Sequence, residues 1–418
     1  MSIYLKRYYE NYCKFFFLYR EEVLNYLIFC SYEVGGFPFK MAEMLNRHGV
    51  KAYYISTSPN SNDHNSTVFH YGERKEDWDI SPLFDKKRHS AGKDIELLKH
   101  IKSRYNISGC FATGYKSYFL DKAGIEYKYW SYGSDLDQSS KYFVFPEKFP
   151  VWKKLVLNPY FLLTFCRMQK ESIIRAKAIM ISSYQFKDCR ALCPETRLFF
   201  LPHLIHIEHY EALSKKKIES KEKICRSIGA ERFFFSSTRH FWSGKNKAFT
   251  DCKGNDVILY SFMSYLKISG DRTSKLVLVK KGPDVIETQR LAQKLGLSNY
   301  IVWIEEMPRD DLLIYYQGAS MCFGQFGTPG LTYAAVEPLS NGTPTVTFIS
   351  NENIKIPFYG VVPPIFNSIE FKEIGNFMNR ITRDESYASK TSYDSWLWAQ
   401  ENCSEEQFVK SFVKEMSS

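Results

Sequence analysis

A glycine-bearing loop followed by one acidic residue offers the clearest chemistry in this sequence. The loop contains Gly324, Gly327 and Gly330, and Glu337 follows on a short predicted helix. The backbone N–H groups of such a loop and of the helix start can bind an anion, because they are unpaired and the helix dipole is positive there. The Glu337 carboxylate can accept hydrogen bonds from sugar hydroxyls. This pattern suits a ligand with a diphosphate and a ribose, although an ordinary loop and helix of an α/β sheet would also show it.

Two cations lie upstream of this loop. Arg239 follows a predicted strand over residues 233–237, and Lys253 precedes a predicted helix. An arginine fork and a lysine point charge can converge on one diphosphate. Lys245 lies between them on a polar insertion. Solvated surface cations are the alternative interpretation of all three.

Alternating strands and helices must position these residues. Apolar runs predict strands over residues 25–31, 50–55, 109–113, 127–131, 178–183, 233–237, 275–279 and 300–304. Residues 178–183 are expected to be the last strand of the first half. Helices are predicted over residues 37–47, 95–105, 256–266, 286–295, 310–316 and 405–415. Strands that alternate with helices indicate an α/β protein with parallel, doubly wound sheets.

A glycine pair ends the first predicted strand. Gly35 and Gly36 lie at its carboxyl end, which is where open α/β sheets bind ligands. A tight turn would also require glycine there.

Length and composition indicate a folded protein of two domains. The chain has 418 residues, 44% of them hydrophobic and 24% charged. Its net charge of +10 and its 17% aromatic content would suit nucleic acid, anionic lipid or phosphorylated substrates. Charge alone does not choose among these partners.

Cysteine spacing and the N-terminus bear on location. The ten cysteines include no Cys-x-x-Cys pair, which suggests free thiols in a reducing compartment. No signal peptide or membrane-spanning run is visible, so we expect a cytoplasmic protein. Residues 1–24 indicate a basic, aromatic amphipathic helix, and residues 149–177 a similar helical stretch broken near Asn158 and Pro159. Residues 1–24 could lie on a membrane or pack against their own domain.

The sequence from about residue 233 to 348 strongly resembles the nucleotide-binding domain of the retaining group 1 (family 4) GT-B glycosyltransferases. The matching segments are Arg239, Lys253-Gly254, Lys280-Lys281-Gly282-Pro283, Leu295-Gly296-Leu297, Val302-Trp303 and Glu337-Pro338-Leu339-Ser340-Asn341-Gly342-Thr343-Pro344. Weaker matches in the first half are Gly35-Gly36, Tyr132-Gly133-Ser134-Asp135 and Leu201-Pro202.

This resemblance implies two Rossmann-like domains whose parallel sheets face each other across a cleft. We expect an acceptor-binding domain over residues 1–202, a linker over 203–212 and a nucleotide-sugar domain over 213–390. A helix over residues 391–418 would cross back to the first domain.

The resemblance also implies roles for individual residues. Arg239 and Lys253 would hold the donor diphosphate and act catalytically, and Glu337 would bind the ribose. Asp135 is the third catalytic candidate, through a polar contact with donor or acceptor, although it could equally cap a helix. The remaining donor-binding candidates are Gly35, Gly36, Lys245, Lys281, Glu305, Met307, Gln325, Gly330, Leu331 and Thr332.

The sequence departs from the family pattern in three places. The family's first acid, eight positions before the second, falls on Pro329, and Gln325 is the candidate substitute. The histidine of the first domain is matched only by Tyr132. The spacing between Arg239 and Lys253 is longer than usual.

The implied activity is transfer of a sugar, with retention, from a nucleotide-diphosphate sugar to a glycan or lipid-linked glycan. A role in a bacterial surface polysaccharide, such as lipopolysaccharide or capsule, and peripheral contact with the inner membrane would fit the basic aromatic segments. We expect no metal, no cofactor and no nucleic-acid partner. The acidic pairs at Asp77-Trp78-Asp79 and Asp135-Leu136-Asp137 and the spaced His203, His206 and His209 are weak metal signals. Rival functions are an epimerase or phosphorylase on the same fold, a non-catalytic glycan-binding or scaffold protein, and a nucleic-acid-binding protein.

Overall fold

A computed structural model of the chain describes residues 24–31, 36–57, 76–84, 90–131, 150, 157–244, 252–351 and 362–418. Almost all of the amphipathic segment predicted over residues 1–24 lies outside these ranges. So do Gly35, Asp135, Lys245 and the segment Tyr132-Gly133-Ser134.

The first lobe is built on a parallel sheet in the order β2-β1-β3-β4-β5-β6. Its strands are β1 (Asn25–Cys30), β2 (Ala52–Ser56), β3 (Ile107–Thr113), β4 (Tyr127–Trp130), β5 (Ala178–Met180) and β6 (Arg197–Phe199). Its α-helices are α2 (Phe37–Arg47), α4 (Ala91–Arg104), α5 (Tyr118–Lys122), α7 (Arg167–Ile174) and α8 (Phe186–Leu192). Short 3-10 turns lie at η1 (Ser81–Leu83), η2 (Tyr115–Ser117) and η5 (Ser183–Gln185).

The second lobe carries a second parallel sheet, in the order β12-β11-β10-β7-β8-β9. Its strands are β7 (Phe233–Ser236), β8 (Lys275–Val279), β9 (Ile301–Ile304), β10 (Met321–Phe323), β11 (Thr345–Thr347) and β12 (Phe366–Asn367). Its α-helices are α9 (Tyr210–Ile228), α10 (Asn255–Ser269), α11 (Val285–Lys294), α12 (Arg309–Gly318), α13 (Tyr333–Ser340), α15 (Phe371–Arg383) and α16 (Glu385–Cys403), with the 3-10 turn η7 (Ser298–Tyr300). The prediction of an α/β protein with two parallel sheets is confirmed.

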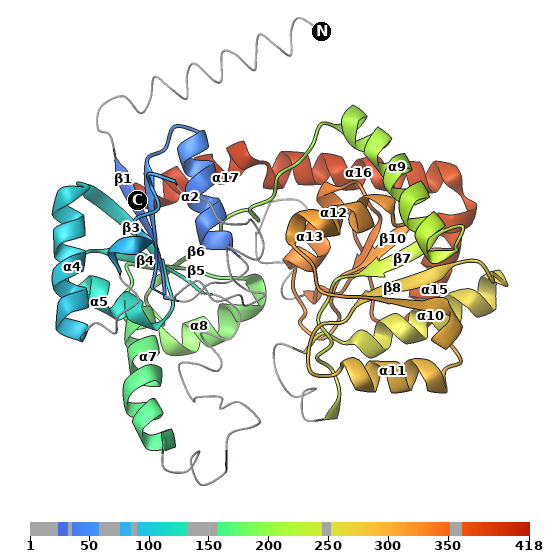
Figure 1. The fold of residues 1–418 in the computed structure, drawn as a ribbon, viewed down its shortest axis with the longest axis horizontal. Coiled ribbons are helices and arrows are strands. Elements are labelled where there is room, and N and C mark those ends of the chain that lie inside the picture. Colours follow the sequence, from blue (N-terminus) through green and yellow to red (C-terminus); the bar gives the residue numbers. More distant parts are fainter. Residues whose placement is uncertain are drawn as a thin grey trace, which may run out of the picture.

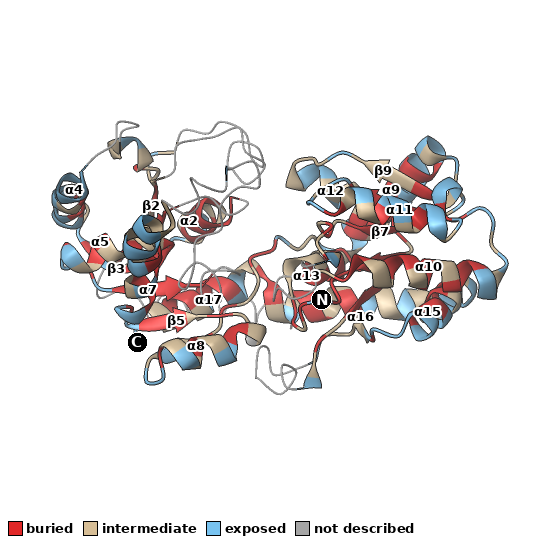
Figure 2. Cartoon of the chain, turned by 90° about the horizontal axis from the view of Figure 1, so that it is seen from below, coloured by how far each residue is buried: buried red, intermediate tan, exposed pale blue. Residues whose placement is uncertain are grey.

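Both sheets are buried on both faces, as parallel sheets require. Along β1, Leu27 and Phe29 belong to one apolar cluster, whereas Tyr26 and Ile28 belong to the cluster on the opposite face. The same alternation holds in β7, where consecutive phenylalanines point to opposite faces. Figure 2 shows inner strands such as β7 buried and the edge strand β9 intermediate, while the outer faces of helices such as α4 and α15 are exposed.

The chain passes between the lobes twice. Residues 201–209 lead from the first lobe to α9, and α16 then leads back to α17 (Glu405–Met416). Phe408 and Phe412 of α17 are buried in the first lobe beside α2 and β1. Figure 1 shows α16 and α17 running along one edge of the molecule from the second lobe to the first.

Several observed boundaries differ from the expected ones. The prediction that residues 178–183 form the last strand of the first half is wrong, because β6 follows; it is a three-residue edge strand and gives no apolar run. Helix α9 begins at Tyr210, inside the predicted linker. The C-terminal segment is two helices, separated at Ser404. The stretch predicted over residues 149–177 is helical from residue 157 and includes a π-helical turn, η4 (Leu162–Cys166).

Candidate functional site

The strand order of the second sheet locates a binding site before any side chain is considered. Numbered from β7 as strand 1, the strands lie in the order 3-2-1-4-5-6, so the order of strand addition reverses between β7 and β10, which are parallel to each other. Ligands of open α/β sheets bind outside the carboxyl ends of the strands at this reversal. The segment after β7 carries Arg239, and the segment after β10 is the glycine-bearing loop.

Arg239 and Lys253 lie close together at this point. The backbone N–H of Lys253 donates to the carbonyl of Phe241 at 2.7 Å. Buried Asn255 accepts from the Phe241 N–H at 3.2 Å and donates to the carbonyl of Thr238 at 3.4 Å. Burial, and next the positive charge of Arg239, lower the pKa of Lys253 to about 7. Hydrogen bonds thus hold the segments of Arg239 and Lys253 together, and the charge of Arg239 affects the ionisation of Lys253.

Arg239 also faces the first lobe. Burial lowers the pKa of its guanidinium, and an electrostatic interaction with Tyr184 of η5 opposes that shift. Its guanidinium lies 5.2 Å from the centroid of the Phe241 ring. Because η5 follows β5, the carboxyl-end loops of the two sheets meet at this residue.

Two glycines let the segment of Lys253 approach the glycine-bearing loop. Gly254 has φ 66° as the N-cap of α10, and a Cβ there would lie 3.0 Å from the backbone N of Gly327. A Cβ on Gly327 would overlap the carbonyl oxygen of Cys252. The N–H of Phe326 donates to the carbonyl of Lys253 at 2.9 Å. Larger residues at either glycine would push the cation away from the loop.

The start of α13 presents unpaired donors beside this loop. In the described part of the chain, no hydrogen-bond acceptor is found for the backbone N–H groups of Leu331 and Thr332. The hydroxyl of Thr332, the N-cap of α13, is buried and has no hydrogen-bond partner among the residues that the structure describes. Gly330 differs from the expectation, because its N–H already donates to the carbonyl of Thr328 at 2.9 Å. Two of the three predicted amides thus remain for an anion.

Gln325 is buried on the same loop, with 3% of its surface exposed. Its carbonyl accepts from the Thr347 hydroxyl at 2.8 Å. Its side-chain amide makes no hydrogen bond to any residue that the structure describes. This amide can therefore hydrogen-bond to a polar ligand.

Glu337 is paired on both of its oxygens. Its Oε1 forms an ion pair with the guanidinium of Arg309, and its Oε2 accepts from the Tyr316 hydroxyl at 2.8 Å. Tyr316 is in turn hydrogen-bonded to Ser237, which follows β7, at 2.8 Å. Glu337 is thus tied to the same sheet edge as Arg239. The sequence analysis did not predict Arg309 and Tyr316 as partners of Glu337. Both residues lie on α12, the helix that precedes α13 in the sequence, and this neighbourhood was the only indication.

The remaining donor-binding candidates of the second lobe lie one and two strands away from β7. Lys281 follows β8 and forms an ion pair with Glu306, while Lys280 pairs with Glu305 at 2.6 Å. The carbonyl of Lys281 accepts from the N–H of His240 at 2.6 Å, which connects this segment to the loop of Arg239. Met307 is half-buried before α12. The structure therefore pairs the ammonium of Lys281 with an acid and does not group it with Arg239 and Lys253.

In the first lobe, Gly36 has φ 70° and is the N-cap of α2. The three spaced histidines do not converge: His203 packs against Tyr333 at 4.6 Å between ring centroids, and His206 contacts Glu405 at 3.2 Å. Across the described ranges, no three His, Cys, Asp or Glu side chains gather as they would around a metal ion.

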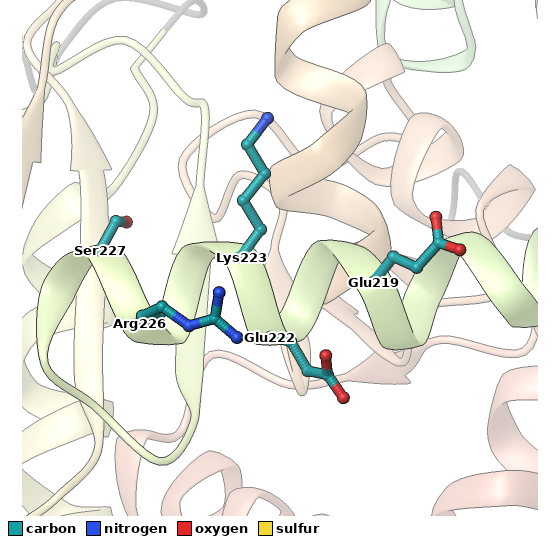
Figure 3. A pocket seen from close by; sticks show the side chains of 5 residues that line it. All are labelled: Glu219, Glu222, Lys223, Arg226 and Ser227. Carbon is teal, nitrogen blue, oxygen red and sulfur yellow. The ribbon is translucent and has the colours of Figure 1, made fainter.

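A surface hollow of about 330 Å³ lies elsewhere, on α9. Figure 3 shows its lining residues, all from this one helix: Glu219, Glu222, Lys223, Arg226 and Ser227. None of the predicted site residues lines it. Its mixed charges and single-helix lining are those of an ordinary helix surface.

No family model matches the sequence, and no curated protein matches it. Solved structures do share its fold. HepE from Anabaena, solved with UDP and glucose, has a TM-score of 0.57 at 12% identity, over 94% of this chain and 99% of that chain. Sucrose-phosphate synthase from Thermosynechococcus elongatus has a TM-score of 0.57 at 13% identity, over 94% and 98%. WaaG, a glycosyltransferase involved in lipopolysaccharide biosynthesis, has a TM-score of 0.54 at 12% identity, over 94% and 100%.

At these identities the likeness shows the fold alone. The chain has the two-lobed GT-B fold that glycosyltransferases such as WaaG adopt, which confirms the predicted fold class.

Proposed function

We propose that this protein is a glycosyltransferase that moves a sugar from a nucleotide-diphosphate sugar to an acceptor. One observation carries the proposal: Arg239 and Lys253 lie within electrostatic range of each other at the β7–β10 reversal, and the adjoining loop ends in the amides of Leu331 and Thr332, which have no acceptor among the described residues. Two cations and a helix start form a site for a diphosphate. Structures of HepE with UDP and with UDP-glucose show that a protein of this fold binds such ligands.

In the proposed reaction the diphosphate departs from the anomeric carbon while negative charge grows on its leaving oxygen. Arg239 and Lys253 would stabilise that charge, which is the largest contribution that a preorganised site makes. These protein cations would take the part that a metal ion plays elsewhere, so we propose a metal-independent enzyme without a cofactor. Retention of configuration is proposed from the family resemblance.

The donor's other groups have candidate partners nearby. Glu337 would bind the ribose hydroxyls, and the segment of Glu305 and Met307 would lie beside the base. Pro329 cannot accept the hydrogen bonds that the family's first acid accepts from the donor sugar. Because the side-chain amide of Gln325 has no partner among the described residues, we propose it as the substitute.

We further propose a glycan or lipid-linked glycan acceptor at the inner face of the cytoplasmic membrane, as in assembly of a surface polysaccharide. Tyr160, Leu162 and Leu163 are exposed apolar residues at the end of the first lobe's long helical stretch; Leu163 is 71% exposed. Arg167 and Lys170 are exposed on the adjoining turns. Exposed apolar side chains next to cations suit an anionic lipid surface. Among the helices of the described residues, none is both long enough and apolar enough to cross a bilayer.

The test combines ligand binding with turnover. We expect the melting temperature to rise with at least one of UDP, ADP or GDP, because a ligand that binds only the native state stabilises it. Lys253→Ala should lower acceptor-dependent turnover by about 100-fold or more, the range for removing a preorganised charge partner. Lys267→Ala, at the exposed end of α10, the helix that follows Lys253, is the matched control and should keep normal turnover.

Near-normal turnover in the Lys253→Ala variant would disprove this assignment. Pro329 favours a second candidate, a non-catalytic glycan-binding relative. That candidate predicts that no nucleotide-sugar turnover occurs with any acceptor.

A further inference from the structure

The carboxylate of Glu337 is occupied in this structure. Arg309 pairs with Oε1 and Tyr316 donates to Oε2, and the side chains of Arg309 and Glu337 are only 19% and 13% exposed. A bond between a guanidinium and a carboxylate is stronger than one between neutral partners. A ribose that reaches Glu337 must therefore compete with Arg309 for that oxygen.

Arg309 is also held by the first lobe. Its guanidinium lies 4.1 Å from the centroid of the Phe37 ring and 5.2 Å from that of Tyr333. The Phe37 and Tyr333 rings are themselves 4.1 Å apart. Phe37 begins α2 in the first lobe, whereas Tyr333 begins α13 in the second. Arg309 thus forms an ion pair within its own lobe and a cation–π contact across to the other.

The linker between the lobes also contacts Tyr333, which packs beside Arg309 and Phe37. The N–H of Leu204 donates to the Tyr333 hydroxyl at 3.1 Å, and His203 packs edge-on against the Tyr333 ring. Burial, and next the charge of Arg309, lower the pKa of His203 to about 3, so its ring is neutral at physiological pH. Both lobes and their connection therefore meet at the acid that we assign to the ribose.

We propose that Arg309 is a built-in competitor for the donor ribose, and that binding of a nucleoside diphosphate displaces it from Glu337 and from Phe37. This inference rests on the proposed role of Glu337. If this displacement occurs, donor binding weakens the contact between Arg309 and Phe37, and that contact weakens donor binding. Because coupling between two equilibria is reciprocal, loosening the Phe37 contact must strengthen nucleotide binding.

Calorimetric titration of the full chain with UDP, ADP, GDP and inorganic pyrophosphate tests this inference. Arg309→Met, which keeps an apolar stem under the rings, should tighten binding of the nucleoside diphosphate by about 5-fold or more, the lower end of typical coupling. Phe37→Ala should act in the same direction while leaving every charge in place. Neither variant should change the affinity for pyrophosphate, which has no ribose. Arg290→Met is the matched control, because Arg290 is exposed on α11 and pairs with Glu287.

Unchanged or weaker nucleoside diphosphate binding in both Arg309→Met and Phe37→Ala would overturn the competition. An equal gain for pyrophosphate would do so too, since the effect would then not involve the ribose. Glu337→Gln separates this failure from that of the proposed function. If Glu337→Gln leaves nucleotide affinity intact, the ribose assignment itself is wrong. If it weakens binding while the other two variants do not strengthen it, only the role of Arg309 is wrong.

Discussion

The fold lowers the pKa of the Lys253 ammonium to near neutral pH. Its backbone is fixed by Phe241 and Phe326, and burial together with Arg239 lowers its pKa to about 7. A free lysine has a pKa near 10.4 and stays charged throughout the physiological range. At neutral pH and without a bound anion, a large fraction of the Lys253 side chains is therefore deprotonated. Binding of a diphosphate should favour the charged form, so Lys253 takes up a proton on binding.

The affinity for a nucleoside diphosphate should consequently fall as pH rises above 7. The nucleotide's terminal phosphate ionises near pKa 6, so above pH 7.5 it contributes little to the change. One linked proton weakens binding by at most about tenfold per pH unit. Isothermal titration between pH 7.5 and 9.5, in buffers of different ionisation enthalpy, should show uptake of one proton.

Lys253→Arg is the informative variant, because arginine stays charged over this range. It should flatten the pH dependence, whereas Lys281→Arg should leave it unchanged. A slope that persists in Lys253→Arg would show that another group takes up the proton.

For individual residues, the sequence was a better guide to which side chains lie at the sheet edge than to which side chains contact them. Arg239, Lys253 and Glu337 were predicted as site residues because each follows a strand or lies on or just before a helix, and the structure places them at the carboxyl edge of the second sheet. Arg309 was missed, because its contacts with Phe37 and Glu337 arise only when distant segments fold together. Lys281 was assigned to the donor, but its ammonium is paired with Glu306; no local pattern distinguishes a lysine with a partner from one without.

Helix α13 has opposite requirements at its two ends. Its N-terminus carries the unpaired amides of the proposed site, whereas its C-terminal carbonyls need donors. Lys217 of α9 lies at this end: its ammonium donates to the carbonyls of the C-cap residue Asn341 at 3.2 Å and of the following Gly342 at 2.5 Å. Burial lowers the pKa of Lys217 to about 8. A cation at this end also complements the helix dipole.

Lys217→Met should destabilise the protein by on the order of 1–3 kcal/mol, because the Asn341 carbonyl then keeps only a 3.4 Å contact from the Thr343 hydroxyl and the Gly342 carbonyl keeps only the Ser392 hydroxyl. Urea unfolding at pH 7 measures the change. Lys216→Met is the matched control: Lys216 is 53% exposed and pairs with Glu208 on the surface, so its loss should have little effect. Equal midpoints for the two variants would contradict this role of Lys217.

Helices and strands were largely predictable, because buried strands of a parallel sheet are continuous apolar runs. Strands β1 and β7 and helix α2 lie within a residue or two of their predicted bounds. Three-residue strands such as β6 and β10 carry too little periodicity to be recognised alone. The π-helical turn at residues 162–166 has no distinct sequence pattern either.

On the scale of the whole molecule, Glu405 joins the returning chain to the first lobe. Its carboxylate contacts the Arg47 guanidinium at 2.6 Å, and His48 and His206 at 3.2 Å each. Burial alone would raise the pKa of Glu405, but hydrogen bonds with His206 and His48 and the charge of Arg47 outweigh it and lower the pKa to about 2. Its usual value is near 4.5.

Because the folded pKa lies below the unfolded one, this group stabilises the native state above about pH 4.5. Its contribution is lost as pH falls toward 2. Glu405→Gln should therefore lower the thermal midpoint at pH 6, and the difference from the native chain should narrow between pH 4.5 and 3. Glu401→Gln, an exposed position on α16, is the control and should show neither effect. A constant difference at every pH would rule out the carboxylate charge as its origin.

The two passages of the chain between the lobes restrict how the molecule can come apart. A protease that cuts the extended segment at residues 201–209 would sever only one of them. The two fragments should still co-migrate under native conditions, because Phe408 and Phe412 of the C-terminal fragment remain packed in the core of the first lobe. We therefore expect the protein to reassemble from two separately expressed polypeptides that are split within that segment.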